Sequence, residues 1–171
     1  AHRTALEAYI RRAKPLVMAL NTQETIDSKL INLRIACHPV RLLADAETHA
    51  QFPQPLITPA SMLPEHLRAE LGDKELLDFG LGIAPACFEF HDSHCIAPTS
   101  LVLAYALAVA TSGRAAQILM AGFDGYPPGD ARNDEVEAMI SAFASSGADE
   151  QVVSITPTRY KGLNACSLYG L

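Results

Sequence analysis

The chain is poor in charged side chains, above all basic ones, and has no long apolar run. Charged residues make up 19% of its 171 residues, below the roughly 25% of an average soluble domain. Only 13 are basic against 19 acidic, a net charge of −6, which argues against a basic face for nucleic acid. The longest apolar run, residues 101–110, is well short of the roughly 20 residues of a membrane span. We expect neither nucleic acid nor a membrane as a partner.

Length and composition predict one domain with a sizeable core. Apolar residues make up 49% of the chain, yet the length is below the roughly 250 residues of a (β/α)₈ barrel. No signal peptide is visible, and the chain does not begin with Met. We therefore expect a cytoplasmic piece of a longer protein. Residues 1–14 would form an N-terminal helix, either packed on the domain or connecting it to a preceding one, and residues 15–171 a single α/β domain.

Apolar runs and helical periodicity alternate along the chain. Three helices are expected with specific ends: a Thr4–Glu7 capping box begins the first, Gly113 follows the second at C′, and Asn133 caps the third. Three more helices are expected, over residues 26–30, from Pro39 onward and over residues 64–71. Strands are expected over residues 16–20, 33–37, 55–58, 76–81, 87–91, 118–121 and 152–155. Near-continuous apolar strands that alternate with helices are typical of a parallel sheet. The predicted fold class is a three-layer, Rossmann-like α/β fold with helices on both faces of a largely parallel sheet.

Polar residues follow several of the predicted strands. They are Asn21, His38 with Arg41 just beyond, Asp124, and Arg159 after the last strand. Ligands of parallel sheets bind beyond the carboxyl ends of the strands, so these residues predict a ligand site at one sheet edge. Asn and Asp also cap helices and form turns, and that alternative stays open.

The helix predicted over 99–112 offers a second signal, because free N–H groups and the helix dipole favour an anion at its start. Ser100 would line this anion site or merely cap the helix. We expect Ser100 and Asp124 to bound one pocket. No G-x-G-x-x-G and no Walker sequence is present, so the common dinucleotide and P-loop interpretations lose their main support. No cofactor is expected, and the catalytic residues stay unknown.

Four cysteines are present, without a C-x-x-C pair, and we expect reduced thiols. The sequence C-x-x-x-H-x-x-H-C over 87–95 carries thiol and imidazole groups that zinc prefers, but its spacing matches no common zinc site. We expect no metal there. His94 and Cys95 would lie in a loop over the binding edge, and His91 would contact a ligand.

Residues 98–126, P-T-S-L-V-L-A-Y-A-L-A-V-A-T-S-G-R-A-A-Q-I-L-M-A-G-F-D-G-Y, carry a family resemblance. Together with A-L-N at 19–21, R-I-A-C-H-P-V-R at 34–41 and S-I-T-P-T-R-Y at 154–160, they resemble a C-terminal domain. That domain is appended to aldolases of the 4-hydroxy-2-oxovalerate aldolase (HMG-CoA-lyase-like) type, often in bacterial surface-polysaccharide clusters. Residues 98–126 are also similar, more distantly, to the MptE-like diphosphokinase and bacterial sialyltransferase fold.

The resemblance implies an upstream aldolase barrel in the full-length chain and a parent protein that is a lyase. The R-D-G and H-x-H signatures of that barrel are absent here, as is the nucleotide loop of the sialyltransferase-like families. By resemblance, Asn21, Ser100 and Asp124 would line an inherited ligand site.

Two function classes remain. The first is an accessory domain that binds a small anionic ligand, such as a sugar phosphate or a nucleotide-sugar-like molecule, or that supports assembly, including a homo-oligomer. The second is a transferase-like enzyme that acts on a nucleotide-activated or phosphorylated sugar.

Overall fold

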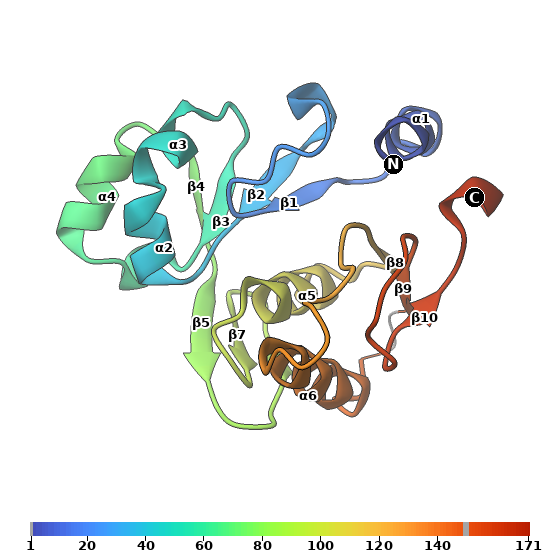
Figure 1. Cartoon of the computed structure of the whole chain (residues 1–171). Helices are drawn as coiled ribbons and strands as arrows, with labels where there is room; N and C mark the ends of the chain where they lie inside the picture. Colours follow the sequence, from blue (N-terminus) through green and yellow to red (C-terminus); the bar gives the residue numbers. More distant parts are fainter. Residues whose placement is uncertain (1, 149–150) are drawn as a thin grey trace.

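The computed structural model describes residues 2–148 and 151–171, and its described strands form three sheets (Figure 1). The first sheet is fully parallel, in the order β1-β2-β3-β4. Its strands are β1 (Met18–Leu20), β2 (Leu33–Ile35), β3 (Leu56–Thr58) and β4 (Leu76–Asp78). Each successive strand is added at the same side, so the sheet grows outward from β1.

The second parallel sheet has the order β8-β9-β10 and grows outward from β8. Its strands are β8 (Gln117–Met120), β9 (Gln151–Ser154) and β10 (Asn164–Ala165). A third, mixed sheet has the order β5-β7-β6 and lies between the two in sequence. It consists of β5 (Gly80–Ile83), β6 (Glu89–Phe90) and β7 (His94–Ala97).

Helices cover the parallel sheets. The short helices α2 (Pro39–Ala44), α3 (Ala46–Gln51) and α4 (Glu65–Leu71) gather beside the first sheet, and α5 (Val102–Ser112) and α6 (Arg132–Ala144) lie together below it in Figure 1. α1 (Arg3–Ala13) lies near the C-terminal 3-10 turn η3 (Leu168–Gly170). Two further 3-10 turns are η1 (Ser28–Leu30) and η2 (Ala60–Met62). The predicted Rossmann-like α/β class is confirmed, with parallel sheets flanked by helices.

The core has two clusters. The larger one surrounds α5, whose Tyr105 is fully buried and donates its hydroxyl hydrogen bond to the Phe79 carbonyl. The smaller one lies under α2 and α4, where Leu42, Leu67 and Leu71 are almost completely buried against the first sheet. Burial of such side chains stabilises the fold by roughly 1.5–3 kcal/mol each.

Three residues do not take the cap positions predicted for them, and for two of these the side chain or its partner is engaged in another contact. α1 begins at Arg3 with His2 as its N-cap, and the Glu7 carboxylate accepts hydrogen bonds from Arg3 Nε at 2.9 Å and Asp27 N at 3.0 Å. Asn133 lies inside α6 and accepts from Tyr126 N at 2.9 Å, which fixes the preceding loop. At the end of α5, Gly113 keeps φ −76° and the left-handed residue is Arg114.

Three predicted segments also differ. The strand expected over 76–81 is two strands in different sheets, β4 and β5. His94 and Cys95 belong to strand β7 and not to a loop, because β7 pairs with β5 on one side and β6 on the other. α5 begins at Val102, three residues later than expected, after the extended N-cap residue Leu101.

Candidate functional site

The two parallel sheets face each other through the edge strands β1 and β8. The chain places β2, β3 and β4 outward from β1, crosses back through the third sheet and α5, and then places β9 and β10 outward from β8. Such a reversal of strand order is where open α/β sheets bind ligands. Within the described residues no hydrogen bond joins β1 to β8. We call the space between these two strands the seam.

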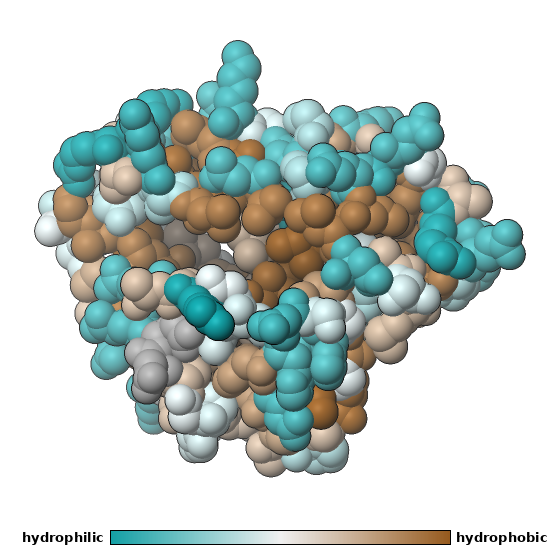
Figure 2. Space-filling view, turned by 180° about the vertical axis from the view of Figure 1, so that it is seen from behind, coloured by the Kyte–Doolittle hydropathy of each residue, from teal (hydrophilic) through white to brown (hydrophobic). Residues whose placement is uncertain are grey.

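A cavity of about 1030 Å³ occupies the seam. Figure 2 shows it as a hollow in an apolar face. It is lined by residues 15–21 around β1 and 117–123 around β8, with Leu6, Tyr9 and Ile10 of α1 and residues 99–103, Ala106, Leu107 and Ala110 of α5 and its N-terminal side. β1 and β8 therefore form its walls, while α1 and α5 contribute apolar side chains. Its volume is at the upper end of the roughly 300–1,000 Å³ of small-molecule pockets.

The cavity lining combines small and large apolar side chains. Five alanines line the cavity, from β1, α5 and both ends of β8: Ala19, Ala106, Ala110, Ala115 and Ala121. All three residues of β1 are only partly buried, as are Ile118 and Leu119 of β8. Strands at the centre of a parallel sheet are normally covered on both faces. The partial exposure of β1 and β8 toward the cavity indicates that side chains do not fill the space between these two strands.

Polar side chains gather where β1 and β2 end, which we call the mouth. Asn21, His38 and Arg41 line the cavity there, as predicted from their places after the strands. Asn21 has φ 51°, and its N–H donates to the Ile35 carbonyl at 2.8 Å. His38 and Arg41 are exposed, so their donors are free to meet a ligand.

Ser100 also lines the cavity, next to the start of α5. The N-cap of α5 is Leu101, and no side chain caps it, so the predicted capping role of Ser100 is wrong. The Ser100 carbonyl accepts a hydrogen bond from Cys37 Sγ at 3.3 Å, which ties the helix start to the end of β2. Burial raises the pKa of the Cys37 thiol to about 12. Cys37 is therefore a protonated structural donor and not a nucleophile.

The other three predicted site residues lie outside the cavity lining: Asp124, Arg159 and His91. Asp124 follows a turn at Gly122, which has φ 81°, and its carbonyl accepts from Arg159 N at 3.2 Å. Ser100 lines the cavity and Asp124 does not, although Phe123 and Tyr126 close to it in sequence do.

His91 belongs to an exposed cluster on the third sheet. Its ring stacks on His94 with centroids 4.2 Å apart, and its Nε2 lies 3.4 Å from Glu89 Oε2. In the described part of the chain no three His, Cys, Asp or Glu residues are grouped to hold a metal ion. All four cysteines are free, as expected, and burial raises the pKa of Cys95 to about 11.

The cavity lining also includes polar residues that the sequence did not indicate, among them Gln23, Thr25 and Glu135. Tyr126, which the sequence places with Asp124 after a strand, lines the cavity too. Glu135 accepts a hydrogen bond from Thr99 Oγ1 at 3.2 Å, which links α6 to the segment before α5. Glu135 comes from a helix distant in sequence, and no local pattern marks it. Tyr126 was part of the G-F-D-G-Y motif, the one signal that pointed near it.

A buried arginine, Arg34, holds the backbone of the mouth in place through hydrogen bonds. Arg34 of β2 is fully buried, and its guanidinium donates to the carbonyls of Asn21 at 3.2 Å and Gln23 at 3.0 Å. The group also stacks 3.4 Å above the Phe52 ring, an arrangement that stabilises a desolvated cation. Arg34 therefore fixes the backbone that carries the Asn21 side chain.

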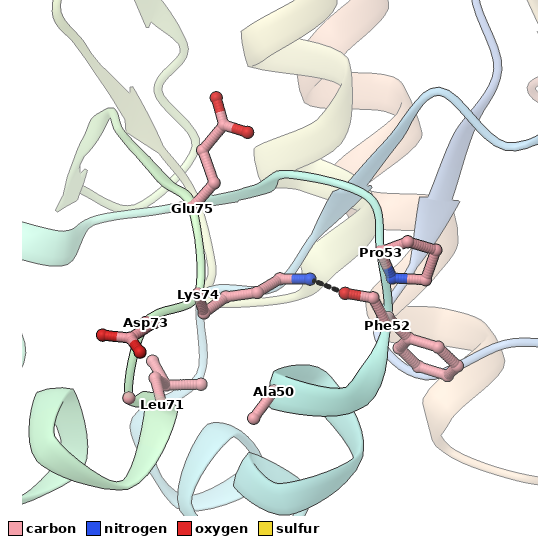
Figure 3. A pocket seen from close by; sticks show the side chains of 8 residues that line it. Ala50, Phe52, Pro53, Leu71, Asp73, Lys74 and Glu75 are labelled. Carbon is pink, nitrogen blue, oxygen red and sulfur yellow. Dashed lines mark hydrogen bonds between the residues drawn. The ribbon is translucent and has the colours of Figure 1, made fainter.

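A second, smaller hollow of about 350 Å³ lies beside Phe52, between the ends of α3 and α4 (Figure 3). The Lys74 ammonium reaches across it to donate to the Phe52 carbonyl, while Asp73 and Glu75 point elsewhere. Burial and the nearby Arg34 charge lower the Lys74 pKa. Because Lys74 is already engaged, the larger cavity is the stronger candidate site.

Comparison with protein-family models, curated proteins and solved structures finds no match to this chain. Among the described residues no helix has the length and apolar character to cross a membrane.

Proposed function

We propose that this chain binds a small anionic molecule in the seam cavity, with its anionic group at the mouth. The observation that carries the proposal is the cavity itself, which opens where the strand order reverses and joins an apolar interior to polar residues at one end. A few convergent polar groups on an apolar pocket are the usual composition of a small-molecule site.

The mouth offers donors suited to a phosphate or carboxylate. Arg41 supplies a guanidinium, and Ser100 and Asn21 supply neutral donors. The first N–H groups of α5 have no intrahelical acceptor and lie beside Ser100, and a helix start favours an anion. Glu135 on the same mouth disfavours a ligand with charge along its whole length and suits hydroxyl groups next to the anion. Sugar phosphates and nucleotide-sugar-like molecules have this arrangement.

Binding without catalysis is the function we favour. Among the described residues that line the cavity there is no thiol, and their one carboxylate, Glu135, is exposed and accepts a hydrogen bond from Thr99. We propose that the domain serves as a cytoplasmic accessory unit of an aldolase-type lyase, joined to an upstream barrel, with roles in surface-polysaccharide synthesis and in oligomer assembly. This context rests on the family resemblance of residues 98–126 and its companion motifs.

A transferase-like activity on a nucleotide-activated or phosphorylated sugar is the alternative. Its support is Glu135 with His38 and Tyr126 at the same mouth, three groups able to exchange protons. Turnover of a nucleotide sugar by the isolated chain, lost in Glu135→Gln, would favour this alternative over binding alone.

The direct test is calorimetric titration of the chain with a hexose phosphate and with a nucleoside monophosphate. We expect Arg41→Gln to weaken binding by about tenfold, because a charge-assisted hydrogen bond is lost. Arg68→Gln is the matched control, since Arg68 is an exposed arginine in the last turn of another short helix, α4, away from the cavity. Equal affinities of the two variants would contradict the proposed mouth.

A further inference from the structure

The seam walls carry backbone groups without partners. Along β1 the N–H of Asn21 and the C=O of Val17 bond to β2, so residues 17, 19 and 21 face β2. In a parallel strand the N–H and C=O of one residue point to the same side, and neighbours alternate. Met18 and Leu20 therefore turn their backbone groups toward the seam.

The same argument holds for the opposite wall. Met120 C=O accepts from Ile155 N at 2.9 Å, and Gly122 N donates to Thr156 Oγ1 at 2.9 Å. Residues 118, 120 and 122 face β9 for that reason, and Gln117, Leu119 and Ala121 face the seam. In the described structure, of the seam-facing groups on both walls only the Leu20 carbonyl has a partner, Gln23 N at 3.3 Å.

The other two sides of the cavity are apolar. α5 contributes Ala106, Leu107 and Ala110, and α1 contributes Tyr9 and Ile10. The space is thus a slot with hydrogen-bonding edges on two sides and apolar faces on the other two. A hydrocarbon chain would displace water from the backbone groups and leave them unpaired, which is costly.

The length of the rows of free backbone groups on the two walls indicates which class of ligand the cavity can hold. On the β1 wall the free groups belong to Met18 and Leu20, which are two positions apart and span roughly 6.6 Å in a strand, whereas on the β8 wall they belong to Gln117, Leu119 and Ala121. The length of the shorter β1 wall fits the edge of one flat heterocycle. An extended peptide gains its affinity from a longer ladder of backbone bonds, which strands of three and four residues do not offer.

From this geometry we infer that the seam takes a nucleobase or a similar planar heterocycle, edge-on between β1 and β8, with its faces against α5 and α1. The inference rests on the proposed function, because the heterocycle would belong to the ligand whose anionic group is bound at the mouth. It narrows the ligand class to nucleotides and nucleotide-linked sugars over simple sugar phosphates.

The test compares uridine and adenosine monophosphates with ribose 5-phosphate and with the free nucleosides, by calorimetry and by amide hydrogen exchange. We expect at least one nucleotide to bind at least about tenfold more tightly than ribose 5-phosphate, the equivalent of one or two net hydrogen bonds. The same nucleotide should slow exchange of the Leu20 and Leu119 amides, and ribose 5-phosphate should not.

Ala106→Leu probes the apolar face of the slot, and Ala138→Leu is the matched control on an exposed face of α6 outside the cavity. We expect Ala106→Leu to remove the preference for the nucleotide and to leave ribose 5-phosphate binding nearly unchanged. Retention of the full preference in Ala106→Leu would overturn the placement of the heterocycle.

The outcomes separate this inference from the proposed function. Equal binding of nucleotide and ribose 5-phosphate overturns the inference and leaves the anion site standing. Binding of the free nucleoside as tightly as its phosphate supports the heterocycle slot and overturns the anion site. Protection of Leu20 and Leu119 by a short apolar peptide, and by no nucleotide, would assign the seam to a peptide and overturn the inference. If none of these compounds binds, both proposals fail.

Discussion

The two sides of β1 differ in packing. Toward β2 and β3 the sheet is closed, and Leu42, Leu56 and Leu71 are completely buried beneath the short helices. Toward β8 the sheet is open, and the whole of β1 is only partly buried. The closed side is filled mainly by leucines, and the open side is lined by leucines and other large apolar side chains as well as by five alanines. The difference between the two sides therefore lies in strand pairing, because among the described residues β1 is hydrogen-bonded to β2 and not to β8.

The largest expected effect is a loss of stability when a buried leucine on the closed side is truncated to alanine. Leu67→Ala removes an almost fully buried side chain of α4 and should lower the free energy of unfolding by about 2–5 kcal/mol. Leu119→Ala in the seam should cost less than about 1 kcal/mol, because Leu119 already borders open space. Urea denaturation measures both. Similar losses in the two variants would remove the contrast between the sides.

The closed side should also lose stability in acid. His49 of α3 is almost fully buried, and burial lowers its pKa from 6.5 to about 4. Between these values the unfolded chain binds a proton that the folded chain refuses, so stability falls as pH drops from 6.5 toward 4. The slope is at most about 1.4 kcal/mol per pH unit, measured as unfolding free energy against pH.

His49→Gln is the control for this pH effect. It removes the titrating group, so its stability should fall less between pH 6.5 and 4 than that of the unaltered chain. An unchanged pH profile in His49→Gln would show that His49 is not the group responsible.

The seam should gain stability when it is filled. Ala106→Leu places a larger apolar side chain in the cavity and should stabilise the fold by about 0.5–2 kcal/mol. Ala138→Leu, on the exposed face of α6, should change stability by less than about 0.5 kcal/mol. Thermal unfolding of the two variants checks this. A destabilised Ala106→Leu protein would show that the seam is already filled by its own side chains.

The sequence predicts the strands that form continuous apolar runs, and β1, β2, β8 and β9 overlap four of these runs. It predicts α1 and α6 from apolar stripes at helical spacing, and α5 from a longer, wholly apolar segment. β7 escaped because His94 and Cys95 follow a polar segment and look like a loop. Its strand conformation comes from pairing with β5 and β6, which a local pattern does not encode.

The site was predictable only in part. Asn21, His38, Arg41 and Ser100 were placed at a ligand edge from their positions after strands and before a helix, and all four line the cavity. Asp124 was expected at the same edge, but it does not line the cavity and lies between two glycines with positive φ, Gly122 and Gly125. The seam itself was invisible in the sequence, since it depends on two strands, nearly a hundred residues apart, that face each other without pairing.

Amide hydrogen exchange of the ligand-free chain tests the open seam most directly. The Leu20 and Leu119 amides face the cavity, whereas the Ile35 and Ile57 amides lie within the closed sheet. We predict that Leu20 and Leu119 exchange on the order of a hundredfold faster or more than Ile35 and Ile57, because among the described residues no carbonyl accepts a hydrogen bond from their amides. Equal protection of all four amides would mean that β1 and β8 pair into one continuous sheet, and it would contradict the account.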